Sequence, residues 1–144
     1  MNPSQLFQIY STLVLPGWLL LVFAPRWGWT EKIITGIIIT ILAFCYVYCI
    51  AGSLDSFDTK SFSTLGNVMK LFTNEIAVLA GWIHYLAFDL MTGLFEVKNA
   101  QKHRINHLLL IPCLFLTFMF GPIGLLLFFI MRIIKNRQYF SSNF

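Results

Sequence analysis

Four long apolar runs dominate the chain and limit what it can fold into. They are Leu6 to Ala24, Ile33 to Ala51, Ile76 to Phe95 and Leu108 to Met131. At about 1.5 Å of rise per residue, a helix over any of these runs would cross a hydrocarbon core about 30 Å thick. Only 11% of the residues are charged, whereas soluble proteins average about 25%. The sequence therefore predicts an all-α integral membrane protein.

The segments between the runs are short, so residues 1–144 are expected to form a single integral membrane domain, a four-helix transmembrane bundle. Four crossings would place both termini on one side of the membrane. Orientation follows the Lys and Arg bias of short loops. On this topology the two sides carry equal numbers of these residues and so give no bias. One side carries Arg26, Lys32, Lys98, Lys102 and Arg104, and the other carries Lys60, Lys70, Arg132, Lys135 and Arg137. These basic residues are expected to meet lipid headgroups, not nucleic acid. So small a bundle is compatible with a homo-oligomer.

The longest connection, Gly52 to Phe72, contains apolar residues spaced by three and four. They are Phe62, Leu65, Met69 and Phe72. This pattern is typical of a short helix in the membrane interface ahead of the third transmembrane helix. An ordered loop packed on the bundle is the alternative.

Asp89 lies inside the third apolar run, where a charged side chain costs about 2.5 to 3.5 kcal/mol on insertion scales. Steps of seven residues return to within about 20° on a helix, so Asp89 and Glu96 share a face, together with Trp82 and Tyr85. His84 lies about 140° away from Asp89 on the same helix. His103 and His107 form an i,i+4 pair if their segment is helical.

Three interpretations of these residues remain open. Asp89 could transfer protons, with Glu96 or a histidine as the complementary group. Asp89, Glu96, His103 and His107 could instead converge on zinc or iron, although no ligand spacing is specific for a metal. Finally, Asp89 could simply hold helices together through hydrogen bonds. The three cysteines all lie in apolar runs and show no spacing typical of a zinc site or a disulfide framework.

The run Trp82 to Leu90, together with Phe95, Glu96 and His107, then Pro112, Cys113, Thr117, Phe118 and the turn Gly121 to Gly124, resembles the abscisic acid deficient 4-like family. The resemblance is loose over the whole chain and close from Ala80 to Leu127. It implies a small four-helix membrane protein. It also implies an isomerase that acts on a carotenoid epoxide without a cofactor or metal, since plant members are implicated in making neoxanthin from violaxanthin.

Such a reaction needs an acid at the epoxide oxygen and a base at a nearby carbon. Asp89, His84 and Glu96 are therefore the expected catalytic residues, and Trp82, Tyr85, His103 and His107 are expected to contact a lipid-soluble isoprenoid substrate. No Arg-rich transit extension precedes the first run, so a bacterial inner membrane is the expected location. Met1 to Gln5 contain no Lys or Arg and Pro25 follows Ala24, so the first run is expected to be retained and not cleaved as a signal peptide.

Two other functions fit the same residues. The chain could be a noncatalytic membrane protein that binds lipid or pigment or scaffolds a partner enzyme. A channel or proton-coupled transporter is disfavoured, because four short helices leave little room for a polar path.

Overall fold

In a computed structural model that describes residues 2–52 and 61–136, all regular structure within these ranges is helical. The helices are α1 (Pro3–Phe23), α2 (Thr30–Ile33), a π-helical turn η1 (Ile34–Ile39), α3 (Thr40–Gly52), α4 (Leu65–Leu71), α5 (Glu75–Lys102), α6 (His107–Phe120) and α7 (Pro122–Asn136). Asparagine side chains cap three of the helix starts, at Asn2, Asn74 and Asn106, which satisfies backbone N–H groups that would otherwise be unpaired.

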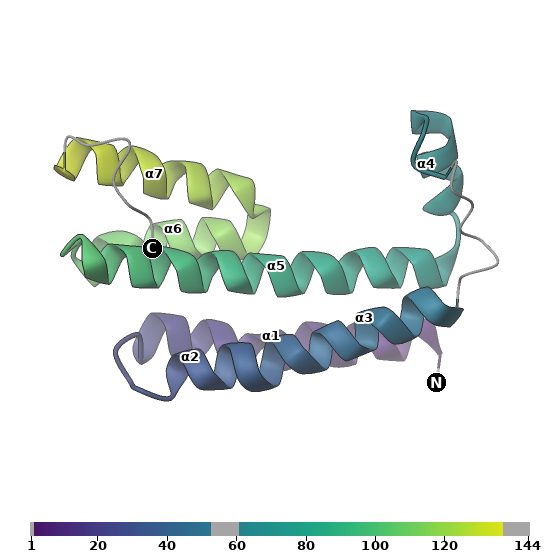
Figure 1. Cartoon of the computed structure of the whole chain (residues 1–144), viewed down its shortest axis with the longest axis horizontal. Coiled ribbons are helices and arrows are strands. Elements are labelled where there is room, and N and C mark those ends of the chain that lie inside the picture. Colours follow the sequence, from purple (N-terminus) through teal and green to yellow (C-terminus); the bar gives the residue numbers. More distant parts are fainter. Residues whose placement is uncertain (1, 53–60, 137–144) are drawn as a thin grey trace.

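Helix α5 lies at the centre of the molecule, with α1 and α3 packed along one side and the α6–α7 pair along the other (Figure 1). Glycines bring α1 close to α5. A Cβ added at Gly93 would lie 2.8 Å from a ring carbon of Trp18, and one added at Gly17 would lie 2.8 Å from Leu90. Such small residues are what membrane helices use to pack tightly, because lipid gives them no hydrophobic driving force for association.

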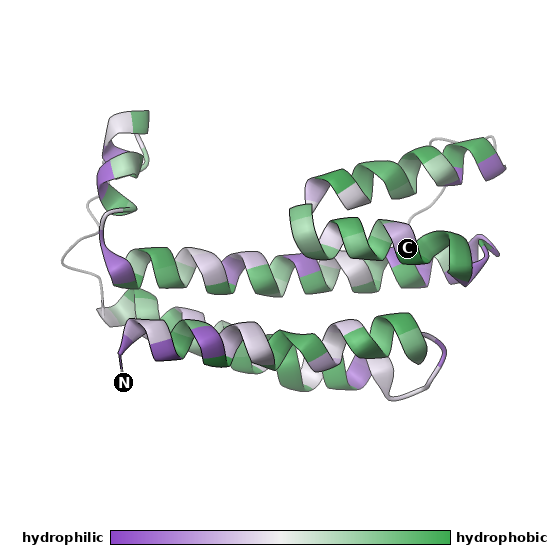
Figure 2. Cartoon of the chain, turned by 180° about the vertical axis from the view of Figure 1, so that it is seen from behind, coloured by the Kyte–Doolittle hydropathy of each residue, from purple (hydrophilic) through white to green (hydrophobic). Residues whose placement is uncertain are grey.

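The protein is an integral membrane protein. Helix α1, the continuous stretch Thr30–Gly52 and helix α5 are each long and apolar enough to cross a membrane. Large apolar side chains, such as Phe44 and Phe115, point outward along these helices and along α6. Most residues of α6 and α7 are also hydrophobic (Figure 2).

The four-helix transmembrane count is not confirmed, because the fourth apolar run is not one helix. It breaks at Gly121, which has a φ of 47°, and α7 folds back antiparallel along α6 (Figure 1). The α6–α7 hairpin therefore enters and leaves at the same end of the bundle. Lys135, near the end of α7, donates a hydrogen bond to the Arg104 carbonyl at 3.0 Å.

This hairpin corrects two expectations. The N-terminal end of α1 lies beside the start of α5, where Phe7 packs on Trp82, whereas α7 ends beside the far end of α5. The two ends of the described chain are thus on opposite sides, not on one. Arg132 and Lys135 join the side that carries Arg26, Lys32, Lys98, Lys102 and Arg104, so the tie in basic residues is broken; Lys60 and Arg137 lie outside the described residues.

The short helix expected before the third transmembrane helix is present as α4. None of its residues is buried. Phe62, Leu65, Met69 and Phe72, the residues that predicted it, are all more than half exposed. Helix α4 projects from the end of the bundle, across the direction of α5 (Figure 1), as an interfacial helix would.

Candidate functional site

A line of polar side chains follows one face of α5, and the α6–α7 hairpin covers most of it. Its members are Tyr85, Asp89, Glu96, Asn99 and His103, which recur at steps of three, four and seven residues. Such steps keep side chains on one face of a helix. Because a membrane interior offers no water to satisfy polar groups, a line of this kind needs an explanation.

Asp89 lies near the middle of α5, at the break between α6 and α7. A Cβ built on Gly121 would lie only 2.6 Å from Oδ1 of Asp89, so the absence of a side chain at Gly121 makes room for the carboxyl group. Asp89 thus lies against the turn that begins at Gly121. Oδ2 of Asp89 is buried and has no hydrogen-bond partner among the described residues.

Tyr85 lies one helical turn before Asp89 and joins α5 to the tip of the hairpin. Its hydroxyl donates a hydrogen bond to the Met119 carbonyl at 3.0 Å, and its side chain also interacts with the Asp89 carboxyl. The Tyr85 hydroxyl and the Asp89 carboxyl therefore form one polar centre at mid-helix. Each can exchange a proton with a bound molecule.

Glu96 lies two turns further along α5 and is completely buried. The Thr117 hydroxyl of α6 donates a hydrogen bond to its Oε1 at 2.8 Å, while Oε2 has no partner in the part of the chain that the structure describes. Gly124 lets α7 approach this pair, because a Cβ there would lie 2.1 Å from the Thr117 hydroxyl oxygen. A buried carboxyl group with one neutral donor is costly, so it points to a role beyond packing.

Beyond Glu96, the polar line continues with Asn99, which is 1% exposed, and with Arg132 of α7, which is 3% exposed. The Arg132 guanidinium donates a hydrogen bond to Oδ1 of Asn99 at 3.0 Å and lies over the Phe129 ring at 5.2 Å. Burial, reinforced by the positive charges of Arg132 and Lys102, lowers the pKa of His103 at the end of α5.

Sequence reasoning missed Asn99 and Arg132. Arg132 was assigned to a membrane surface because it follows the last apolar run. The available signal was the spacing of α5, since Asn99 comes three residues after Glu96 and so continues the same face.

Two of the expected site residues, His84 and His107, lie away from this line, whereas Trp82 stacks on Tyr85 with ring centroids 5.4 Å apart. His84 is exposed and its ring stacks on Phe88 at 4.4 Å, on another face of α5. Trp82 donates a hydrogen bond from Nε1 to the Ser11 hydroxyl at 2.9 Å and thereby fastens α5 to α1. His107 bonds through Nε2 to the Val22 carbonyl of α1 at 2.8 Å.

The candidate metal ligands, Asp89, Glu96, His103 and His107, are not gathered in the described part of the chain either. Within residues 2–52 and 61–136, no group of three or more His, Cys, Asp or Glu side chains is placed to hold one ion. His107 faces α1, while Asp89 and Glu96 face the hairpin. The geometry thus gives the proton-transfer interpretation more support than the metal interpretation.

An apolar groove of about 390 Å³ lies between α1 and α6. Trp18, Phe115 and Phe118 are among its lining residues, and the rings of Trp18 and Phe118 meet edge to face with centroids 5.3 Å apart. Trp82 and Tyr85, which were expected to contact the substrate, are not among the residues that line the groove. All its lining residues come from α1 and α6.

Comparison with known proteins gives one family and one curated relative. The model of the ABA DEFICIENT 4-like family matches residues 5–128. The chain is 28% identical over 144 residues to Protein ABA DEFICIENT 4, chloroplastic, of Arabidopsis thaliana. That alignment covers 94% of this chain and 64% of the relative, so the chain spans a little under two thirds of the relative's length. No solved structure matches.

Proposed function

The chain belongs to the ABA DEFICIENT 4-like family, and from this premise we propose that it is a membrane-embedded isomerase of a carotenoid or another isoprenoid lipid. The observation that carries the proposal is the pair Asp89 and Glu96, two carboxyl groups on one face of a transmembrane helix beneath a broken hairpin. Acid–base chemistry needs titratable groups of this kind in a site that excludes water.

The resemblance to this family implies an epoxide substrate and an allenic alcohol product. Asp89 donates a proton to the epoxide oxygen as the C–O bond breaks, and Glu96 accepts a proton from a neighbouring carbon. One proton is given and one is taken, so the product keeps the mass of the substrate and no electrons are exchanged. The Tyr85 hydroxyl interacts with the Asp89 carboxyl group and helps to orient it. His84, which was expected to be catalytic together with Asp89, has no part in this scheme because it lies on another face of α5.

A noncatalytic role is the second candidate, and specific contacts favour it. The Thr117–Glu96 and Arg132–Asn99 hydrogen bonds both join α5 to the hairpin, as polar groups that fix helix packing would. In that case the protein binds a lipid or pigment without converting it, or it acts as a scaffold for a partner enzyme. Homo-oligomerisation remains a prediction.

The protein resides in a membrane, but the expected bacterial inner membrane has no support from the relative, whose name places it in the chloroplast. It therefore remains a prediction too.

The experiment that separates the two roles compares Asp89→Asn with wild type in cells that make epoxidised carotenoids. Asparagine keeps the shape of the side chain and removes its titratable proton, so the inserted amount should persist while product formation falls by at least about 100-fold. His84→Asn is the matched control, because His84 is on the same helix and away from the hairpin. Pigments are separated by chromatography and weighed by mass spectrometry.

An isomer of unchanged mass, made by wild type and His84→Asn but not by well-inserted Asp89→Asn, is the expected result. If wild type alters no carotenoid or other isoprenoid lipid, the isomerase proposal is wrong. If Asp89→Asn retains full activity, Asp89 is not the acid.

A further inference from the structure

Two hollows lie end to end between α1 and its neighbours. The inner hollow is the apolar groove of about 390 Å³ between α1 and α6. The outer hollow, about 350 Å³, is bounded by residues 22–27, by the end of α5 and by the start of α6. Val22 lines both, so the two hollows adjoin at this residue, and together they are here called the α1–α6 groove. Both helices lie on the near face in Figure 2.

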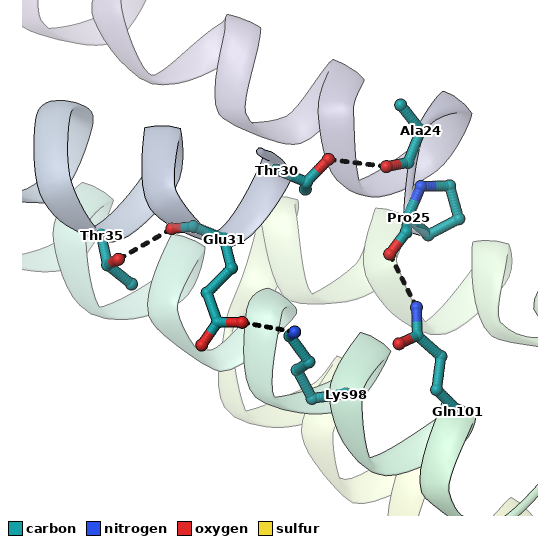
Figure 3. A network of polar contacts seen from close by, with 7 residues as sticks. All are labelled: Ala24, Pro25, Thr30, Glu31, Thr35, Lys98 and Gln101. Carbon is teal, nitrogen blue, oxygen red and sulfur yellow. Dashed lines mark hydrogen bonds and ion pairs between the residues drawn. The ribbon is translucent and has the colours of Figure 1, made fainter. Parts of the chain in front are cut away.

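The outer hollow has walls that the fold holds in place. Gln101 of α5 donates a hydrogen bond to the Pro25 carbonyl at 2.7 Å, and Thr30 donates one to the Ala24 carbonyl at 2.6 Å. An ion pair between Lys98 and Glu31 ties the start of α2 to α5 beside them (Figure 3). The loop from α1 to α2 is therefore fixed against α5, and the hollow is formed before any ligand arrives.

The polar groups of this hollow suit a hydroxyl group. The Nε2 of His107 must donate to the Val22 carbonyl, because a carbonyl oxygen only accepts. In the neutral ring this leaves Nδ1 as an acceptor. Arg26, which also lines the hollow, supplies only donors. A hydroxyl group can accept from Arg26 and donate to His107, whereas the phosphodiester of a lipid headgroup has no proton to offer His107.

The groove is long enough to reach from this hollow to the level of the carboxyl pair. His107 and Phe118 are eleven positions apart on α6, or about 16 Å along its axis. The inner end of the groove is lined by Phe118, whose neighbours Thr117 and Met119 bond to Glu96 and Tyr85. The groove thus extends from the end of the bundle that carries Arg26 to the level of the proposed chemistry.

We propose that the α1–α6 groove binds an elongated isoprenoid that carries a hydroxyl group at one end. The hydroxyl group lies at Arg26 and His107, and the chain lies along Trp18, Phe115 and Phe118. The inference rests on the proposed function for its substrate class. It adds where that substrate binds and which end of it is recognised.

The test uses the full chain reconstituted in phosphatidylcholine vesicles with two probes, zeaxanthin and β-carotene. These pigments share a carbon skeleton, but only zeaxanthin has ring hydroxyl groups. Binding is measured in the dark by induced circular dichroism of the visible band. Wild type should bind zeaxanthin about five to thirty times more tightly than β-carotene, the ratio expected of one or two hydrogen bonds.

Two pairs of variants locate the binding. Arg26→Gln should abolish the preference for zeaxanthin, whereas Lys102→Gln, an exposed cation at the same end but outside the hollow, should keep it. Leu19 lines the inner hollow and is 56% exposed, so Leu19→Trp should fill the hollow without disturbing the core. This variant should bind both pigments at least tenfold more weakly. Phe44→Trp, on an exposed face of α3, should leave the affinity for both pigments unchanged.

Equal affinity of wild type for the two pigments would overturn the proposal, as would undiminished binding by Leu19→Trp. Displacement of zeaxanthin by added phosphatidylglycerol in wild type, but not in Arg26→Gln, would mean that the outer hollow binds a lipid phosphate, and the proposal would again be wrong. The isomerase proposal fails separately. Wild type that binds zeaxanthin as expected but changes no epoxidised carotenoid in cells would contradict only the isomerase proposal.

Discussion

Gly121 shows how one residue permits a charged side chain in the middle of a membrane helix. Its φ of 47° ends α6, and its missing side chain leaves room for the Asp89 carboxyl group. Gly121→Ala should therefore destabilise the protein by about 1–3 kcal/mol, because it combines backbone strain with a clash. Thermal unfolding in detergent would measure the loss.

The control is Gly28→Ala, since a Cβ at Gly28 would meet nothing within 4 Å. Combining Gly121→Ala with Asp89→Ala should recover the part of the loss that comes from the clash. A Gly121→Ala protein as stable as wild type would contradict the strained turn.

At this scale the sequence predicted much of the site. The cost of a carboxyl group in lipid placed Asp89 toward the bundle, and the seven-residue step placed Glu96 on the same face. His84 could not be placed relative to a partner, because periodicity gives the angle between side chains of one helix but not which neighbouring helix meets each face. Arg132 was missed for the same reason, since its neighbour Asn99 belongs to another helix.

Among the elements, α6 and α7 are where sequence reasoning failed. Leu108 to Met131 is long and continuously apolar, and length with hydropathy alone predicts one crossing. A Gly-Pro pair within such a run is compatible with a kink or with a full reversal. Tertiary contacts favour the reversal, because Gly124 packs on Thr117 and Arg132 donates a hydrogen bond to Asn99.

The hairpin should accordingly depend on Arg132. Arg132→Leu leaves Asn99 buried without the hydrogen bond from Arg132, which costs about 1–3 kcal/mol, and it should loosen α7 from α5. Disulfide formation between Arg104→Cys and Lys135→Cys, in a chain whose three native cysteines are replaced by alanine, reports their proximity. We expect Arg132→Leu to slow this cross-link severalfold and Lys102→Leu, an exposed position, to leave it unchanged. Equal rates in all three proteins would mean that Arg132 does not hold the hairpin.

The hairpin places nearly all the basic residues of the described chain at one end of the bundle, and this predicts how the molecule is oriented in the membrane. Of the eight Lys and Arg residues in the described part of the chain, only Lys70 lies at the end of the bundle where α5 begins; the other seven are Arg26, Lys32, Lys98, Lys102, Arg104, Arg132 and Lys135. Positive residues near helix ends stay on the side where a membrane protein is made. The connections from α1 to α2 and from α5 to α6 should therefore face that side, and α4 and the start of α1 the other.

Labelling of single cysteines in intact bacterial cells tests this arrangement, again in a chain whose native cysteines are replaced by alanine. A membrane-impermeant maleimide should modify Ser4→Cys, before the first crossing, without permeabilisation. Gly28→Cys, in the loop between α1 and α2 where a side chain meets no neighbour, should react only after the membrane is opened. The reversed pattern would contradict the orientation while keeping the fold. With Lys135→Cys as a third site, reaction from the same side as Ser4→Cys would restore the fourth crossing, because α7 would then end on the side where α1 begins.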